Sequence, residues 1–142
     1  MSYRFIPQLE DEDIRRQQEE GLRSTLARVW NSPQYGSKLR ACGLNPGDQL
    51  GLDDLARLPT VDVDDLREGY PLPLLCVPPT DVVRIHASSG TTGKRKILAY
   101  TAADVETFNL QMARCYELAG LTAEDRMQIA VGYGLWTAGV GF

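Results

Sequence analysis

The segment RIHASSGTTGKRKILAY, residues 84–100, decides the fold because its character changes twice within a few positions. Residues 82–86 and 96–100 are rich in the apolar, β-branched and aromatic side chains that favour strands, whereas residues 87–94 between them are small and polar. The pattern therefore predicts a strand, a loop and a second strand.

The loop between the predicted strands carries the groups that a polyphosphate site requires. Gly90 and Gly93 can adopt positive φ and turn backbone N–H groups toward an anion. Serine and threonine hydroxyls can donate hydrogen bonds to phosphate oxygens, and lysines can offset the charge of a departing pyrophosphate. The candidate phosphate-binding residues are Ser88, Ser89, Gly90, Thr91, Thr92, Gly93, Lys94 and Lys96.

The spacing of this loop bears on two other interpretations. A Walker A loop has the pattern GxxxxGK followed directly by Ser or Thr, and it leads into a helix whose N-terminus faces the phosphates. Here the two glycines are too close together, Arg95 follows Lys94, and a strand is predicted next, which disfavours that loop. A plain hairpin turn rich in small polar residues stays open as a minority interpretation, since Ser, Thr and Gly crowd turns for local reasons.

Upstream of the loop, the sequence predicts helices followed by a chain broken by prolines. Residues 11–31 are expected to form a helix with one apolar stripe, made of Ile14, Leu22, Leu26 and Val29. Turn signals such as NPG at 45–47 leave room only for short helices, one of them at residues 62–67 with Asp62 as its cap. Residues 1–79 are therefore expected to be a helical and proline-rich segment that wraps another part of the protein.

Downstream of the loop, a long helix and a further strand are predicted. Thr101 and Asp104 form a capping box, and apolar residues then recur at helical spacing until Gly120. Residues 126–131 are a third strand candidate, followed by a glycine-rich end. The alternation favours an α/β fold with a mixed, partly parallel sheet that is incomplete, because three strands and one helix cannot cover both of its faces. Residues 80–142 are thus expected to be the truncated start of an α/β nucleotide-binding subdomain.

Composition narrows the class of partner. The chain has 142 residues, 43% of them hydrophobic, and a net charge of −4, so it offers no broad attraction to nucleic acid or to an anionic membrane. Three scattered cysteines and one histidine argue against a disulfide framework and a metal site. Because no long apolar run follows the N-terminus, we expect a cytoplasmic protein without a signal peptide or membrane span.

The pattern Ser88-Ser89-Gly90-Thr91-Thr92-Gly93-x-x-Lys96 resembles the phosphate-loop signature of the adenylate-forming superfamily, which includes acyl-CoA synthetases, luciferases and peptide-synthetase adenylation domains. Within that superfamily the chain is most similar to the phenylacetate-CoA ligase group. This narrower likeness rests on residues 84–94, on Tyr100-Thr101, on GYGLW at 132–136, and upstream on LARLP at 55–59 with DLR at 65–67. It covers essentially the whole chain as the N-terminal portion of such a ligase.

The resemblance implies part of the N-terminal domain of an enzyme that uses ATP, Mg²⁺ and coenzyme A. In that reaction a carboxylate attacks the α-phosphorus of ATP, which gives an acyl-adenylate and pyrophosphate, and the coenzyme A thiol then displaces AMP. It implies catalytic roles for Thr91, Thr92 and Lys96, and a substrate-binding role for Tyr133, Gly134 and Trp136. The implied partners are a small carboxylic acid, and either a second copy in a homodimer or the remainder of the ligase.

Some positions depart from the pattern of the group. Arg95 stands where the phenylacetate ligases usually have proline, Lys96 where they have threonine, and VGYGLW at 131–136 where they typically have YGYGLF. The acid therefore stays open, with an aryl or arylacetic acid other than phenylacetate as one alternative. The superfamily's magnesium-handling Thr-Glu pair, ribose-binding aspartate and C-terminal catalytic lysine cannot be assigned here, so the isolated chain is expected to be inactive. A non-catalytic nucleotide-binding module and an interaction domain remain the competing hypotheses.

Two further residues carry structural expectations. His86, beside the loop, is expected to be a hydrogen-bonded structural residue rather than a substrate ligand. Cys115, on the apolar side of the second long helix, is expected to be a buried small hydrophobic residue.

Overall fold

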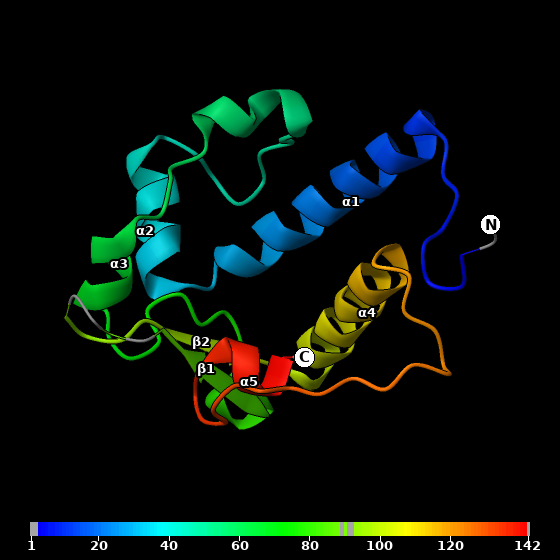
Figure 1. Ribbon diagram of the computed structural model, residues 1–142. Helices are drawn as coiled ribbons and strands as arrows, with labels where there is room; N and C mark the ends of the chain where they lie inside the picture. The colour runs from blue at the N-terminus through cyan, green and yellow to red at the C-terminus, as the bar shows by residue number, and fades with distance from the viewer. Residues whose placement is uncertain (1–2, 89, 91–92, 142) are drawn as a thin grey trace. The chain divides into compact units, whose positions relative to one another are not determined.

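The computed structural model describes residues 3–88, 90 and 93–141 (Figure 1). Contacts within the chain divide it into two units, one formed by Leu9–Pro79 and the other by Met1–Gln8 with Thr80–Phe142. The expected division into domains 1–79 and 80–142 stays a prediction. No helix within the described ranges is both long and apolar enough to cross a membrane.

The unit Leu9–Pro79 is helical. It contains α1 (Asp11–Val29), α2 (Pro33–Ala41), the short 3₁₀ helix η1 (Leu52–Arg57) and α3 (Val63–Glu68). Its core is a cluster of four buried leucines, with further apolar side chains packed against it: Leu26, Leu39, Leu44 and Leu50, then Leu22, Val29, Trp30, Tyr35 and Leu58. Burial of this apolar surface is what holds these short helices together, since helices of such length are marginal alone.

The sequence around Ser32 ends one helix and begins another. The helix predicted over residues 11–31 ends at Val29. Ser32 Oγ then accepts a hydrogen bond from the Tyr35 N–H at 3.2 Å, and Pro33 occupies the first turn of α2, where its missing N–H is harmless. The same motif that predicted a helix end is therefore also the start of α2.

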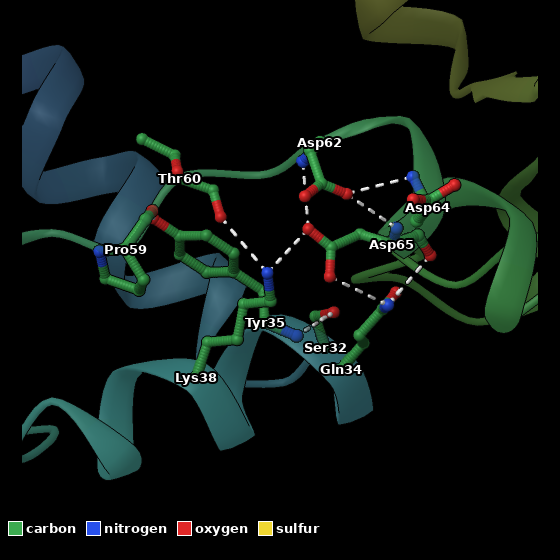
Figure 2. A network of polar contacts seen from close by, with 9 residues as sticks. All are labelled: Ser32, Gln34, Tyr35, Lys38, Pro59, Thr60, Asp62, Asp64 and Asp65. Atoms are coloured by element: carbon green, nitrogen blue, oxygen red, sulfur yellow. Dashed lines mark hydrogen bonds and ion pairs between the residues drawn. The ribbon is translucent and has the colours of Figure 1, made fainter.

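A polar network joins α2 to the start of α3, as Figure 2 shows. Lys38 Nζ lies 2.5 Å from Asp65 Oδ2 and donates to the Thr60 carbonyl at 3.2 Å. Gln34 Nε2 donates to the Asp65 carbonyl at 2.7 Å. The side chain of Asp62 accepts from the N–H groups of Asp64 and Asp65, so Asp62 is the N-cap of α3, as the sequence predicts.

The second unit contains a hairpin and a long helix. Its elements are η2 (Pro79–Asp81), β1 (Arg84–Ala87), β2 (Ile97–Tyr100), α4 (Ala102–Leu118) and α5 (Thr137–Gly141). β1 and β2 pair antiparallel, with Arg84 opposite Tyr100 and Ala87 opposite Ile97. Thr101 and Asp104 form the predicted capping box, and Gly120, at a φ of +85°, follows the end of α4.

The strand expected at residues 126–131 is wrong: within the described structure these residues form no strand and are mostly exposed. A strand needs a neighbouring strand for its backbone hydrogen bonds, and the described sheet consists of β1 and β2. These two strands pair antiparallel, so the described part of the sheet is incomplete, as expected, and holds no parallel pair.

The N-terminal segment is held against the C-terminal part of α4. The carboxylate of Glu117 accepts hydrogen bonds from the N–H groups of Arg4, Phe5 and Ile6, the last two at 3.0 and 3.1 Å. Arg114 Nε donates to the Phe5 carbonyl at 2.9 Å. Burial raises the pKa of Glu117, but these three N–H donors and the nearby charge of Arg4 outweigh it, so the pKa lies below its usual value.

Candidate functional site

The base of the candidate phosphate loop is closed by Ser88 and Lys96. The Ser88 N–H donates to the Lys96 carbonyl at 2.9 Å, and the Lys96 N–H donates to Ser88 Oγ at 3.0 Å. The two residues continue the β1–β2 pairing by one step, so the loop begins and ends at a fixed point of the hairpin.

The two glycines have the backbone conformations that their sequence positions predict. Gly90 has a φ of +74° and Gly93 a φ of +133°, a region that L side chains rarely adopt. The Gly93 N–H donates to the Gly90 carbonyl at 3.4 Å, which closes a turn. A Cβ atom on Gly90 would lie 2.6 Å from Cγ of Arg95, so a side chain here would displace Arg95 as well as strain the backbone.

Positively charged side chains follow the turn directly. Lys94 and Arg95 are exposed, and Lys96 is half-buried. Ser89, Thr91 and Thr92 lie outside the described residues, so their assigned roles stay predictions. The hairpin thus brings Ser88, Gly90, Gly93, Lys94 and Lys96 of the predicted set into one short loop.

His86 has an environment that sequence reasoning did not predict. Its side chain is 2% exposed, and neither ring nitrogen has a hydrogen-bond partner among the described residues. The imidazole packs on the ring of Tyr100 at 4.7 Å between centroids and on Phe108 of α4 at 6.0 Å. The expectation of a hydrogen-bonded histidine was therefore wrong, because the ring is enclosed by aromatic side chains. Burial, and secondarily the charge of Arg84, lowers the pKa of His86.

The candidate substrate-binding segment lies beside the base of the loop. The Leu135 carbonyl accepts a hydrogen bond from the Ala87 N–H at 2.6 Å, on the edge of β1 that does not face β2. Tyr133 and Trp136 are 69% and 50% exposed, so within the described residues they are not core aromatics. Gly134 stands between them in the chain and is also exposed. Sequence reasoning named these residues, and the Ala87–Leu135 bond is the long-range contact that it could not supply.

The described structure does not gather side chains that could ligate a metal ion. In the part of the chain that the structure describes, no group of three or more His, Cys, Asp and Glu side chains is placed to hold a metal. The cysteines are equally dispersed: Cys42 and Cys115 are exposed, and Cys76 is half-buried. The expectation that Cys115 is buried was wrong, because the face of α4 that carries it has no described neighbour covering it.

Comparison with known proteins identifies relatives of one kind. No family model matches the chain. It is 41% identical over 129 residues to the phenylacetate-coenzyme A ligase of Pseudomonas putida, a match that covers 90% of this chain and 29% of the relative. It is 40% identical over 131 residues to the Escherichia coli K12 protein of the same name, with coverages of 92% and 30%. The chain therefore spans about 30% of the length of the curated relatives it matches.

A solved structure has the same fold. The 2-hydroxyisobutyryl-CoA ligase crystallised with 2-HIB-AMP and CoA superposes with a TM-score of 0.80 at 24% identity, over 94% of this chain and 30% of that one. The α/β fold class is confirmed, as the fold of about 30% of that solved structure. The resemblance to the adenylate-forming superfamily, and within it to the phenylacetate-CoA ligases, is confirmed along nearly the whole chain.

Proposed function

We propose that this chain is the N-terminal, phosphate-binding portion of an ATP-dependent ligase that activates an aryl or arylacetic acid and transfers the acyl group to coenzyme A. The observation that carries the proposal is the closed hairpin loop, with Gly90 and Gly93 at positive φ and cations directly after them. That loop occurs in a chain whose curated relatives, at 40% and 41% identity, are named phenylacetate-coenzyme A ligases.

Each described loop residue has a distinct role in this proposal. The backbone of Gly90 and Gly93 can approach an anion closely because no side chain intervenes. Ser88 Oγ already accepts the Lys96 N–H, which leaves the hydroxyl hydrogen available for a phosphate oxygen. Lys94 and Lys96 supply positive charge, and we propose that Thr91, Thr92 and Lys96 act in the chemical step while Ser89 binds phosphate.

The proposed chemistry needs such a loop because negative charge builds on the β- and γ-phosphates as pyrophosphate departs. Hydroxyl donors, amide donors and ammonium groups that meet this charge lower the barrier to the extent that they bind the transition state more tightly than ATP. The first step joins the carboxylate oxygen to the α-phosphorus and breaks the bond to pyrophosphate. The second joins the coenzyme A sulfur to the acyl carbon and releases AMP.

The acid itself would bind at Tyr133, Gly134 and Trp136. The Ala87–Leu135 hydrogen bond supports this, because it holds their segment at the strand end from which the loop starts. An aromatic side chain offers a flat apolar wall to an aryl group. Mg²⁺ would enter with the ATP phosphates, since the described residues offer no cluster of ligands for it. We further propose that the protein works in the cytoplasm. This chain would act there either in a homodimer or together with the remainder of the ligase.

Loop variants in the intact protein that carries this segment test the proposal. Changing Thr91, Thr92 and Lys96 to alanine together should lower ATP–pyrophosphate exchange with an aryl acid by at least about a hundredfold, the usual effect of removing preorganised donors from developing charge. Thr107→Ala is the matched control, because the Thr107 hydroxyl donates to the Ala103 carbonyl on the surface of α4. Exchange at an undiminished rate in the triple variant would overturn the proposal.

The isolated chain gives a second test. Pyrophosphate release with ATP and a panel of aryl acids should stay at background, because the residues assigned elsewhere in such ligases are absent. ATP should nevertheless slow hydrogen exchange of residues 88–96 relative to the amides of α1. Clear turnover by the isolated chain would contradict the assignment of this segment as a portion of the ligase.

A further inference from the structure

The side chain of Arg95 packs against Gly90 of the candidate phosphate loop. The space that a Gly90 side chain would fill is taken by Arg95: a Cβ atom there would lie 2.6 Å from Cγ and 3.5 Å from Nε of the arginine. The same position lies 3.3 Å from the Gly93 carbonyl oxygen. The aliphatic stem of Arg95 thus lies against the backbone of Gly90, while the side chain as a whole stays exposed.

The charge at the end of that stem is not neutralised within the described structure. Arg95 is exposed, and it takes part in none of the ion pairs among the described residues. A guanidinium group has five N–H donors in a planar fork that fits two oxygens of a phosphate at once. An arginine whose stem already packs against the loop loses less conformational freedom on binding phosphate than one whose whole side chain is free.

We propose that Arg95 is a third cationic contact of the loop and binds oxygens of the β- and γ-phosphates of the nucleotide and of the pyrophosphate that leaves. This inference rests on the proposed function and adds a binding residue to it. Gly90 serves the contact indirectly, because only glycine leaves room for the arginine stem. If Arg95 only packed on the loop, any long side chain could replace it. A need for its charge and for its planar fork therefore distinguishes phosphate binding from packing.

Charge-removing and charge-keeping variants test it in the intact protein, with Mg-ATP and inorganic pyrophosphate as probes. Arg95→Gln keeps most of the stem and should raise the dissociation constants of both probes about tenfold, as expected for the loss of a hydrogen-bonded charge on phosphate. Arg95→Lys keeps the charge without the fork, so its dissociation constants should lie between those of the parent and those of Arg95→Gln. Arg126→Gln is the matched control, since Arg126 is also exposed and also outside the described ion pairs.

A double-variant cycle with Gly90→Ala tests the structural part. A methyl group at position 90 displaces the arginine stem, so Arg95→Gln should weaken pyrophosphate binding less in the Gly90→Ala background than in the parent. Parent-like affinity of Arg95→Gln, while the variant with Thr91, Thr92 and Lys96 changed to alanine loses binding, overturns this inference and leaves the proposed function standing. No binding of either probe by the parent protein overturns both.

Discussion

Ser88 and Lys96 bind each other twice, once from backbone to backbone at 2.9 Å and once from the Lys96 N–H to the Ser88 hydroxyl oxygen at 3.0 Å. The Ser88 hydroxyl oxygen accepts the N–H that a backbone carbonyl would accept in a regular strand pair. The first residue of the loop therefore holds the residue at which the loop ends. The position of Lys96 therefore depends on a side chain that sequence reasoning assigned only to phosphate binding.

Replacing Ser88 should loosen the loop before any ligand is added. Ser88→Ala removes one of the two bonds, and a typical net hydrogen bond of about 1 kcal/mol corresponds to a roughly fivefold loss of hydrogen-exchange protection at the Lys96 amide. The matched control is Ser37→Ala, because the Ser37 hydroxyl donates to the Pro33 carbonyl within α2. This change should leave the protection of the Lys96 amide unaltered. Unchanged protection of Lys96 in Ser88→Ala would show that the backbone bond suffices.

The leucine core of the unit Leu9–Pro79 should respond strongly to truncation at Leu39, whose side chain is 0% exposed. Leu39→Ala should lower the free energy of unfolding by about 2–5 kcal/mol, through lost burial and the cavity left behind. Leu55→Ala, at a leucine that is 52% exposed, should change it by no more than about 0.5 kcal/mol. Urea unfolding followed by Trp30 fluorescence, in a Trp136→Phe background, makes the comparison; equal effects would contradict the assigned core.

Local chemistry made parts of this fold predictable from sequence. Asp62 and Thr101 were identified as helix caps because a cap needs only a short polar side chain and a backbone N–H two or three residues away. The hairpin of residues 84–100 was predictable for the same reason, since two strand-like runs flank a small polar loop. Gly90 and Gly93 were identified from their residue type as able to adopt positive φ, and both have it in the structure.

Features that depend on distant residues were not predictable. Residues 126–131 have strand-like composition but no described strand beside them, and composition cannot say whether a partner exists. The apolar stripe of a helix gives the relative faces of its side chains but not what covers them, which is why Cys115 was expected to be buried and is exposed. The enclosure of His86 between Tyr100 and Phe108 likewise needs the packing of α4 on the hairpin.

The Lys38–Asp65 pair predicts how the unit Leu9–Pro79 responds to pH. The hydrogen bond from Lys38, followed by the N–H of Asp62, holds the pKa of Asp65 below its usual value of about 3.9, so its stabilisation is present above that value and is lost as pH falls through the folded pKa. The hydrogen bond to Asp65 raises the pKa of Lys38, so that contribution is lost only as pH rises through a value above about 10.4.

Asp65→Asn should therefore lower the melting temperature at pH 7 and shrink the further loss seen between about pH 4 and pH 2, where the parent carboxylate becomes protonated. Asp64→Asn is the control, because the Asp64 side chain is 78% exposed in its pair with Arg67. Thermal melts at a series of pH values measure both. Parallel melting curves for Asp65→Asn and the parent across that range would contradict the assigned role of the pair.

His86 predicts a separate response to mild acid in the second unit. The folded pKa of His86 is lowered, whereas the imidazole of the unfolded chain has a pKa of about 6.5. Below about pH 6.5 the unfolded state therefore binds more protons than the folded state, so stability should fall as pH drops. Arg84 on the same strand adds to this effect, while Tyr100 and Phe108 enclose the ring. The pKa values of Glu117 and Asp125 are lowered, so their stabilisation is present above about pH 4 and is lost only at lower pH, which keeps that range apart from the range of His86.

His86→Phe should remove the stability change between about pH 6.5 and pH 5 and should leave the protein at least as stable at pH 7. The replacement keeps an aromatic ring on Tyr100 and Phe108 and takes away two buried nitrogens without partners, each of which costs about 1–3 kcal/mol when left unpaired. Urea unfolding of parent and variant at pH 7, 6 and 5 measures the effect, and His86 is the single histidine of the chain, so no other imidazole contributes. A pH slope in His86→Phe equal to that of the parent over this range would place the acid sensitivity elsewhere, because a phenyl ring cannot take up a proton.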